Sequence, residues 1–93
     1  MKLSYLATIK TNHPDADFWI IRKGSESKVG TPVRTFSSEH IGIKVTATDV
    51  LIPDYLFYVM EHLVNIGYWK DRAMGTLNLK HITCQQVKDI RFG

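Results

Sequence analysis

The sequence predicts a small α+β domain in which a short, mostly antiparallel β-sheet packs on one long buried helix, with a short helix near the C-terminus. Three observations lead to this prediction. Residues 53–66 have the pattern of a helix, several flanking segments alternate between apolar and polar residues as strands do, and residues 83–86 fit a helix-capping motif. A chain of 93 residues is long enough for one hydrophobic core, so we expect a single domain over residues 1–93.

Composition and charge indicate an ordinary globular protein with a slightly basic character. Hydrophobic residues make up 44% of the chain and charged residues 23%, which argues against a disordered tail. No apolar run is long enough for a membrane span, and we see no secretory signal. Cys84 is the only cysteine, so we expect no internal disulfide and a reducing, cytoplasmic setting. The net charge of +3 favours an anionic partner.

Three segments in the first half of the chain are expected to form strands. Residues 3–10 alternate, which predicts a half-buried strand or a short turn that leads into one. Residues 18–21 are apolar without alternation and predict a strand that is covered on both faces. Residues 40–46 alternate cleanly, with three apolar side chains on one face. Asn, Pro and Asp within residues 12–15 predict a turn between the first two strands.

The helix of residues 53–66 has recognisable ends. Pro53 suits the first helical position because its missing N–H would have no partner there, and Gly67 fits a left-handed C-terminal cap. Asp54 places a negative charge in the first turn. The polar residues fall on one narrow stripe, formed by Asp54, Tyr58, Glu61 and Asn65. Since the remaining arc is apolar, we expect the helix to be buried on several sides and most of its aromatic residues to be structural.

A further strand is expected at residues 77–81, where apolar and polar residues alternate again. The pattern predicts that Leu77 and Leu79 point inward and that Asn78 and Lys80 point outward.

The last part of the chain predicts a short helix and a closing strand. Thr83 and Gln86 fit a capping box, in which each side chain satisfies a free backbone N–H at the start of a helix. Residues 88–92 then predict a final strand with Ile90 and Phe92 inward.

The sequence contains no convincing catalytic group. Its four histidines are scattered without the spacing of a zinc site, and neither a P-loop nor a dinucleotide-binding glycine motif occurs. A nucleophile–base pair of Cys84 and His81 lacks a third residue to orient it. We therefore expect a protein that is not an enzyme and that holds no metal ion and no cofactor.

The loop of residues 22–34 is the first candidate binding segment. It contains four positive charges and one negative charge, together with glycine, serine and proline. One interpretation is a solvated hairpin tip, because charged loops usually lie at the surface. The other is a phosphate-contacting loop, in which glycine and serine permit close approach of the backbone while arginine and lysine supply charge.

Several motifs in a fixed order resemble a known family. They are IRKGS (21–25) with KVG (28–30), IPDYLFYVM (52–60), and MGTLNLKHI (74–82) followed by VKDIRF (87–92). Together they resemble the target recognition domain of type I restriction–modification specificity subunits, as does LATIKT (6–11). The likeness covers roughly residues 3–92. No heptad-patterned spacer helix accompanies these motifs, so the resemblance is to a stand-alone, trimmed copy of such a domain.

The resemblance implies a domain that reads double-stranded DNA through loops on one face. The residues expected at this DNA-binding surface are Arg22, Lys23, Ser25, Lys28, Arg34, Lys70, Arg72, Thr76, Asn78 and Lys80. The basic side chains of residues 22–34 would contact phosphates, and Asn78 and Lys80 would reach towards bases or the backbone. Trp69, which lies next to this set, is interpreted as a core aromatic residue.

The expected partners follow from the same resemblance. They are double-stranded DNA and the methyltransferase or restriction subunits, and a single half-site reader would gain from forming a homodimer. The alternative is a protein-interaction module, or an inhibitor or regulator of a restriction complex or another nucleic-acid-processing complex. An exposed apolar patch, for instance around Tyr68 and Trp69, would favour that alternative.

Overall fold

The computed structural model describes residues 1–92 and confirms the α+β class. In chain order the elements are η1 (Leu3–Tyr5), β1 (Ala7–Thr11), β2 (Phe18–Ile20), β3 (Lys23–Gly24), β4 (Pro32–Val33), β5 (Ile41–Val45), α1 (Pro53–Asn65), β6 (Met74–Thr76), β7 (Leu79–His81) and α2 (Cys84–Lys88). The strands form two sheets instead of the single sheet that we expected. One has four strands in the order β1-β5-β2-β4, and the other has three in the order β3-β7-β6. Every pair of neighbouring strands is antiparallel.

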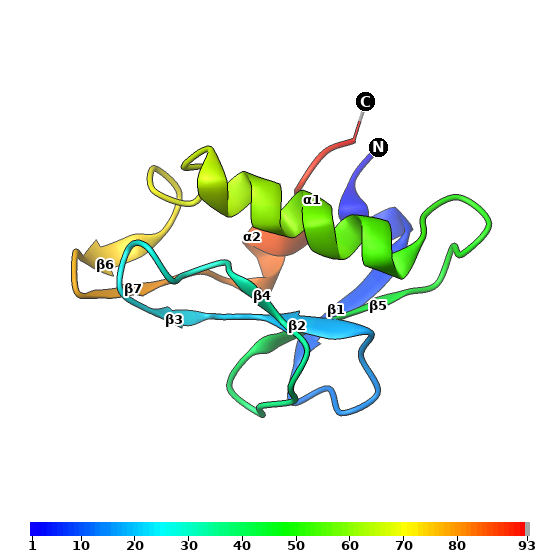
Figure 1. Ribbon diagram of the computed structural model, residues 1–93, viewed down its shortest axis with the longest axis horizontal. Coiled ribbons are helices and arrows are strands. Elements are labelled where there is room, and N and C mark those ends of the chain that lie inside the picture. Colours follow the sequence, from blue (N-terminus) through cyan, green and yellow to red (C-terminus); the bar gives the residue numbers. More distant parts are fainter. Residues whose placement is uncertain (93) are drawn as a thin grey trace.

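Helix α1 runs along the long axis of the molecule and covers one face of the four-stranded sheet (Figure 1). Phe18 on β2 meets Phe57 on α1 edge to face, with the ring centroids 5.4 Å apart. The pairs Phe18–Ile43 and Ile20–Ile41 across β2 and β5 share this face. The fully buried core contains Phe18, Ile20, Ile41, Ile43, Leu56 and Met60. Helix α2 packs against β1 and η1 and closes the same core from the side.

Two loops, instead of a helix, cover part of the opposite face of the four-stranded sheet. Trp19 points to this face, where its indole Nε1 donates a hydrogen bond of 2.9 Å to the backbone oxygen of His13. Its ring also lies edge to face against Phe36, at 5.9 Å. Gly42 is buried beneath His13, so closely that a Cβ at this position would come within 2.6 Å of the His13 Cβ. Strand β2 is therefore buried on both faces, as its unbroken apolar sequence predicts.

The predicted ends of α1 are confirmed. The helix begins at Pro53, and Gly67 adopts a positive φ of 78° beyond its C-terminus. The N–H of Tyr68 reaches the Leu63 oxygen at 2.9 Å, and that of Gly67 reaches the Val64 oxygen at 3.1 Å. These two hydrogen bonds form a Schellman cap, which satisfies carbonyl groups that the helix leaves free.

The expected burial of α1 on several sides is not confirmed. Only Leu56 and Met60 are fully buried, while Tyr55 and Tyr58 are about 60% exposed. The helix lies on one layer of sheet and faces solvent on its other side, so only one stripe of its apolar arc is covered. Tyrosine tolerates this position because its hydroxyl stays hydrated while part of its ring packs.

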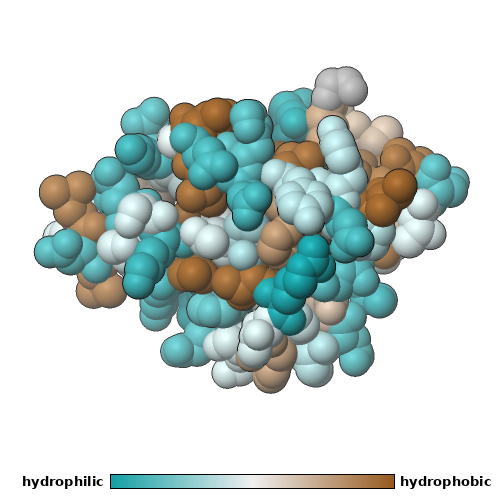
Figure 2. Space-filling view, in the orientation of Figure 1, coloured by the Kyte–Doolittle hydropathy of each residue, from teal (hydrophilic) through white to brown (hydrophobic). Residues whose placement is uncertain are grey.

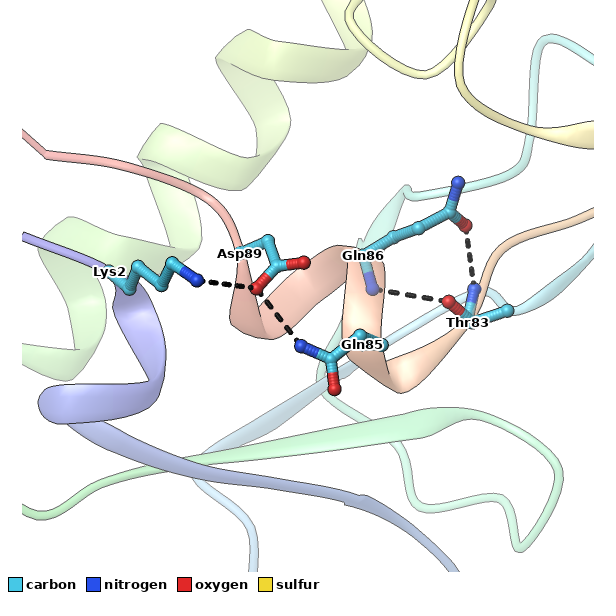
Figure 3. A network of polar contacts seen from close by, with 5 residues as sticks. All are labelled: Lys2, Thr83, Gln85, Gln86 and Asp89. Carbon is cyan, nitrogen blue, oxygen red and sulfur yellow. Dashed lines mark hydrogen bonds and ion pairs between the residues drawn. The ribbon is translucent and has the colours of Figure 1, made fainter.

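The capping box at the start of α2 is confirmed (Figure 3). The Gln86 N–H donates to the Thr83 hydroxyl at 3.1 Å, and the Thr83 N–H donates to the Gln86 side-chain oxygen at 2.9 Å. At the other end, Asp89 accepts a hydrogen bond from Gln85 at 3.0 Å and pairs with Lys2 at 3.4 Å. The helix is thus tied to the first residues of the chain.

The two outermost strand predictions are partly right. For residues 3–10 the sequence predicts either a half-buried strand or a short turn that leads into one. The structure has the second arrangement, in which the short turn η1 leads into β1, and Tyr5 is exposed. The closing strand is reduced to one isolated bridge between Lys2 and Arg91, with Ile90 buried and Phe92 partly buried. Within residues 1–92, no helix combines the length and apolar character that crossing a membrane requires.

His13 is predicted to make stability depend on pH. Burial lowers the pKa of its imidazole below the ordinary value of 6.5; Lys10 and Lys44 lower it further, against weaker opposition from Asp15 and Asp17. The unfolded chain therefore takes up a proton before the folded protein does, so stability is lost as the pH falls below about 6.5.

Denaturant titrations between about pH 5 and 7.5 measure the free energy of unfolding of the wild-type protein and of His13→Gln, and so test the role of His13. The variant should lose the part of the pH dependence that sets in near 6.5. An unchanged pH profile in the variant would show that another group is responsible.

Candidate nucleic-acid interface

Three segments that are far apart in the sequence meet at one end of the molecule. Strand β3 pairs with β7, the Glu26 N–H donates to the Leu77 oxygen at 3.0 Å, and Lys80 Nζ donates to the Lys70 oxygen at 3.3 Å. We call residues 23–28, 69–70 and 74–81 together the hairpin end. It contains the β6–β7 hairpin, which projects from the molecule in Figure 1. The structure thus brings together parts of the three segments that the sequence analysis names for the DNA-binding surface.

Trp69 and Gly30 hold the hairpin end against the rest of the domain. Trp69 is 2% exposed, which confirms its interpretation as a core residue, and its indole ring lies directly on Gly30. A Cβ at Gly30 would overlap the ring, and Gly30 also has a φ of 87°, a conformation that other residues rarely adopt. The indole Nε1 has no hydrogen-bond partner among residues 1–92. The contact therefore depends on close packing alone.

The two faces of the hairpin are the reverse of those expected. Met74 pairs with His81 and Thr76 with Leu79, so these side chains share one face of the ribbon, and all four residues are exposed. Lys23 is paired with His81 and extends the same face onto β3. We call these five residues the outer face; Gly75 and Lys80 lie on the inner one.

The inward prediction for Leu77 and Leu79 is therefore wrong, since each is 67% exposed. The outward prediction for Lys80 is also wrong, because its side chain is only 13% exposed and pairs with Glu26 at 3.3 Å. Successive side chains of a strand point to opposite faces, so one wrong choice of the buried face reverses the prediction for every residue. The alternation itself is present in the sequence, but the buried face is the other one. Lys80 is accommodated inside because its long stem packs while its ammonium group meets Glu26.

Three lysines of the predicted surface remain available for a ligand. Lys23, Lys28 and Lys70 are exposed, and none of them has an ion-pair partner within residues 1–92. Glu26 is already paired with Lys80 and so offsets little of their charge. Thr76 and Asn78 are exposed on the hairpin between them, and Ser25 is partly buried in the turn after β3.

The three predicted arginines do not belong to this set. The Arg22 Nε donates to the Glu39 oxygen at 2.9 Å. Arg34 follows β4, and its guanidinium reaches the first turns of α1, where it is 3.4 Å from Asp54 and stacks 4.0 Å from the Phe57 ring centre. These two side chains brace other parts of the fold, and the sequence could not show this because their partners are 17 and 20 residues away.

Arg72 is held in the same way on a different part of the surface. Its guanidinium donates to the Tyr68 oxygen at 2.8 Å and stacks 3.8 Å from the Tyr68 ring centre. Both residues line a groove of about 490 Å³ next to α2, together with Leu63, Gln86, Asp89, Ile90 and Arg91. Because Trp69 is buried and Arg72 stacks on Tyr68, the exposed apolar patch considered at Tyr68 and Trp69 is not present.

Sequence reasoning missed Met74, Leu79 and His81 as surface residues of the hairpin end. The glycine at position 75 is the signal in the sequence that could have revealed them. In the structure it has a φ of 113°, and a Cβ at this position would collide with the Leu79 backbone oxygen. Such a close approach of two strands indicates a tight hairpin that projects from the body, where neither face is certain to be buried.

Within residues 1–92, no three His, Cys, Asp or Glu side chains come together in a way that could hold a metal ion. Cys84 is a free, partly buried thiol at the first position of α2. Comparisons with family models, with curated proteins and with solved structures found no match for this chain.

The packing of Trp69 on Gly30 generates a stability prediction. Gly30→Ala should lower the free energy of unfolding by roughly 2–4 kcal/mol, because it adds both backbone strain and an overlap with the indole. Gly67→Ala is a matched control, since Gly67 also has a positive φ but its Cβ would meet only the flexible Lys70 side chain at 3.5 Å.

The control should lose only about 1 kcal/mol, the cost of the backbone conformation. Urea denaturation of both variants measures the difference. Equal losses would show that Trp69 does not hold the hairpin end as described.

Proposed function

We propose that this protein is a non-enzymatic double-stranded DNA-binding module that contacts the duplex through its hairpin end. The observation that carries the proposal is the grouping of three exposed lysines, Lys23, Lys28 and Lys70, around a projecting β-hairpin. They come from three separate segments, and each could neutralise a backbone phosphate. Phosphate neutralisation by lysine and arginine supplies most of the affinity of non-specific DNA binding.

The shape of the hairpin supports the same function. β-Ribbon proteins place strands in the major or the minor groove of DNA, so a projecting two-stranded ribbon suits this role. Asn78 lies in the turn of the hairpin and Thr76 just before it, both exposed. Their side chains can donate and accept hydrogen bonds at base edges, while the lysines on either side fix the position of the ribbon.

The resemblance to the recognition domain of restriction–modification specificity subunits adds independent support. Its basic segment and its Gly-Thr segment are the two that supply β3 and the β6–β7 hairpin. A role within a restriction–modification system, with methyltransferase or restriction subunits nearby and a homodimer for two half-sites, belongs to this proposal.

A protein-interaction module is the second candidate, and one observation favours it. The start of α1 lies at the end of the molecule opposite the hairpin (Figure 1). A mainly apolar groove of about 430 Å³ lies beside it. Its lining residues are Met1, Leu6, Val50, Leu51, Tyr55 and Phe92. Val50 and Tyr55 are more than 60% exposed, so a partner protein could cover them.

The DNA-binding proposal predicts which lysines matter. Lys28→Ala and Lys70→Ala should each weaken binding to a random-sequence duplex pool, and each should reduce the slope of log K against log salt by about 1. Lys44→Ala is the matched control, because Lys44 is an exposed lysine on the four-stranded sheet. Arg34→Ala should also leave the slope unchanged, since Arg34 is engaged by Asp54 and Phe57.

A salt titration of each variant measures these slopes, and sequencing of the retained duplexes shows whether a motif is enriched. If Lys44→Ala changes the slope as much as Lys28→Ala, the contact surface lies elsewhere. Absence of duplex binding by the wild-type protein at low salt would contradict the DNA-binding function and favour the second candidate.

A further inference from the structure

The hairpin carries apolar side chains that are largely exposed. Leu77 and Leu79 are each 67% exposed and Met74 is 48% exposed. Figure 2 shows apolar surface at this end of the molecule with hydrophilic side chains beside it. Leu77 is one of the two residues that connect β6 to β7, so it occupies the outermost turn.

These side chains are not needed to hold the hairpin in place. The hairpin is anchored by backbone pairing with β3, by the hydrogen bond from the Glu26 N–H to the Leu77 oxygen, and by the Lys80–Glu26 ion pair. All of these contacts use backbone atoms or the inner face. The leucines at the tip are therefore available to a partner without any loss of packing.

The surroundings of the tip restrict what the partner can be. Lys23 and Leu79 line the same pocket, which has a volume of about 220 Å³. Lys28 also lies close to β3, because its Cβ would be 3.7 Å from a Cβ placed at Gly24. A partner that fits must combine an anionic surface with an apolar interior within reach of a leucine side chain. A DNA duplex has both, with phosphates outside and stacked bases inside.

We propose that Leu77, supported by Leu79, inserts between base pairs from the minor groove as an apolar wedge. This inference rests on the proposed DNA-binding function and deepens it. Apolar wedges of this kind partly unstack one base step and kink the duplex, and asparagine is among the residues that read the minor groove beside them. Asn78, next to the wedge, occupies that position.

The wedge also explains why the recognition surface is mixed in character. A lysine-only surface would bind the duplex backbone without selecting a site. Insertion of a leucine costs least at pyrimidine–purine steps, which unstack easily, so the hairpin would prefer sites that contain such steps. Selectivity would then come from deformability of the DNA as well as from base-edge contacts.

The test uses short duplexes in which 2-aminopurine replaces one adenine at a TpA or CpA step, because the fluorescence of this base rises when it is unstacked. At saturating protein, the wild-type protein should raise the fluorescence. Leu77→Ser should abolish the rise while it keeps the salt slope of binding, since the lysines remain. Ile52→Thr, which removes another exposed apolar side chain at the start of α1 and away from the hairpin, should behave as wild type.

Four results would overturn the wedge. If the wild-type protein binds the duplex without a rise in fluorescence, or if Leu77→Ser retains the rise, the tip does not insert, although the DNA-binding function would stand. If the protein binds no duplex at low salt, the wedge and the proposed function fail together. Binding to phosphatidylserine vesicles that depends on Leu77, without unstacking of the duplex, would assign the tip to a lipid surface.

Discussion

The contact between the Trp69 indole and Gly30 is the constraint on which the functional end of this domain depends. It fastens the chain after α1 to the segment between β3 and β4, and those two segments flank the projecting hairpin. The strands of the three-stranded sheet pair with one another and not with those of the four-stranded sheet, so without this contact they would form a small ribbon, and isolated ribbons are marginal in water. A glycine with positive φ and a buried tryptophan thus determine where the lysines and the hairpin tip lie.

The basic residues divide into two groups with different physical roles. Arg22, Arg34 and Arg72 are engaged by backbone oxygens, a carboxylate or aromatic rings, as suits a planar group with several donors. Lys23, Lys28 and Lys70 are exposed and free of ion pairs within residues 1–92. Net charge alone could not reveal this division. The proposed DNA contact follows from the lysines, which lie around the projecting β6–β7 hairpin.

Local signals predicted the parts of the fold that local chemistry determines. Pro53, Gly67 and the Thr83–Gln86 capping box define helix ends, and all of them behave as the sequence indicates. The face of the β6–β7 hairpin could not be predicted in this way, because it depends on Glu26, which is 54 residues from its partner Lys80. The exposure of one side of α1 likewise depends on how many layers pack around it, which no helical periodicity shows.

The most direct test of the account is a map of the DNA-contact surface by backbone NMR of the wild-type protein, with a duplex pool added at low salt. The account predicts that amide shifts change in residues 23–28, 69–70 and 74–81 and that the exposed side of α1 is unaffected. Changes confined to the groove formed by Val50, Tyr55 and Phe92, or no changes at all, would contradict it.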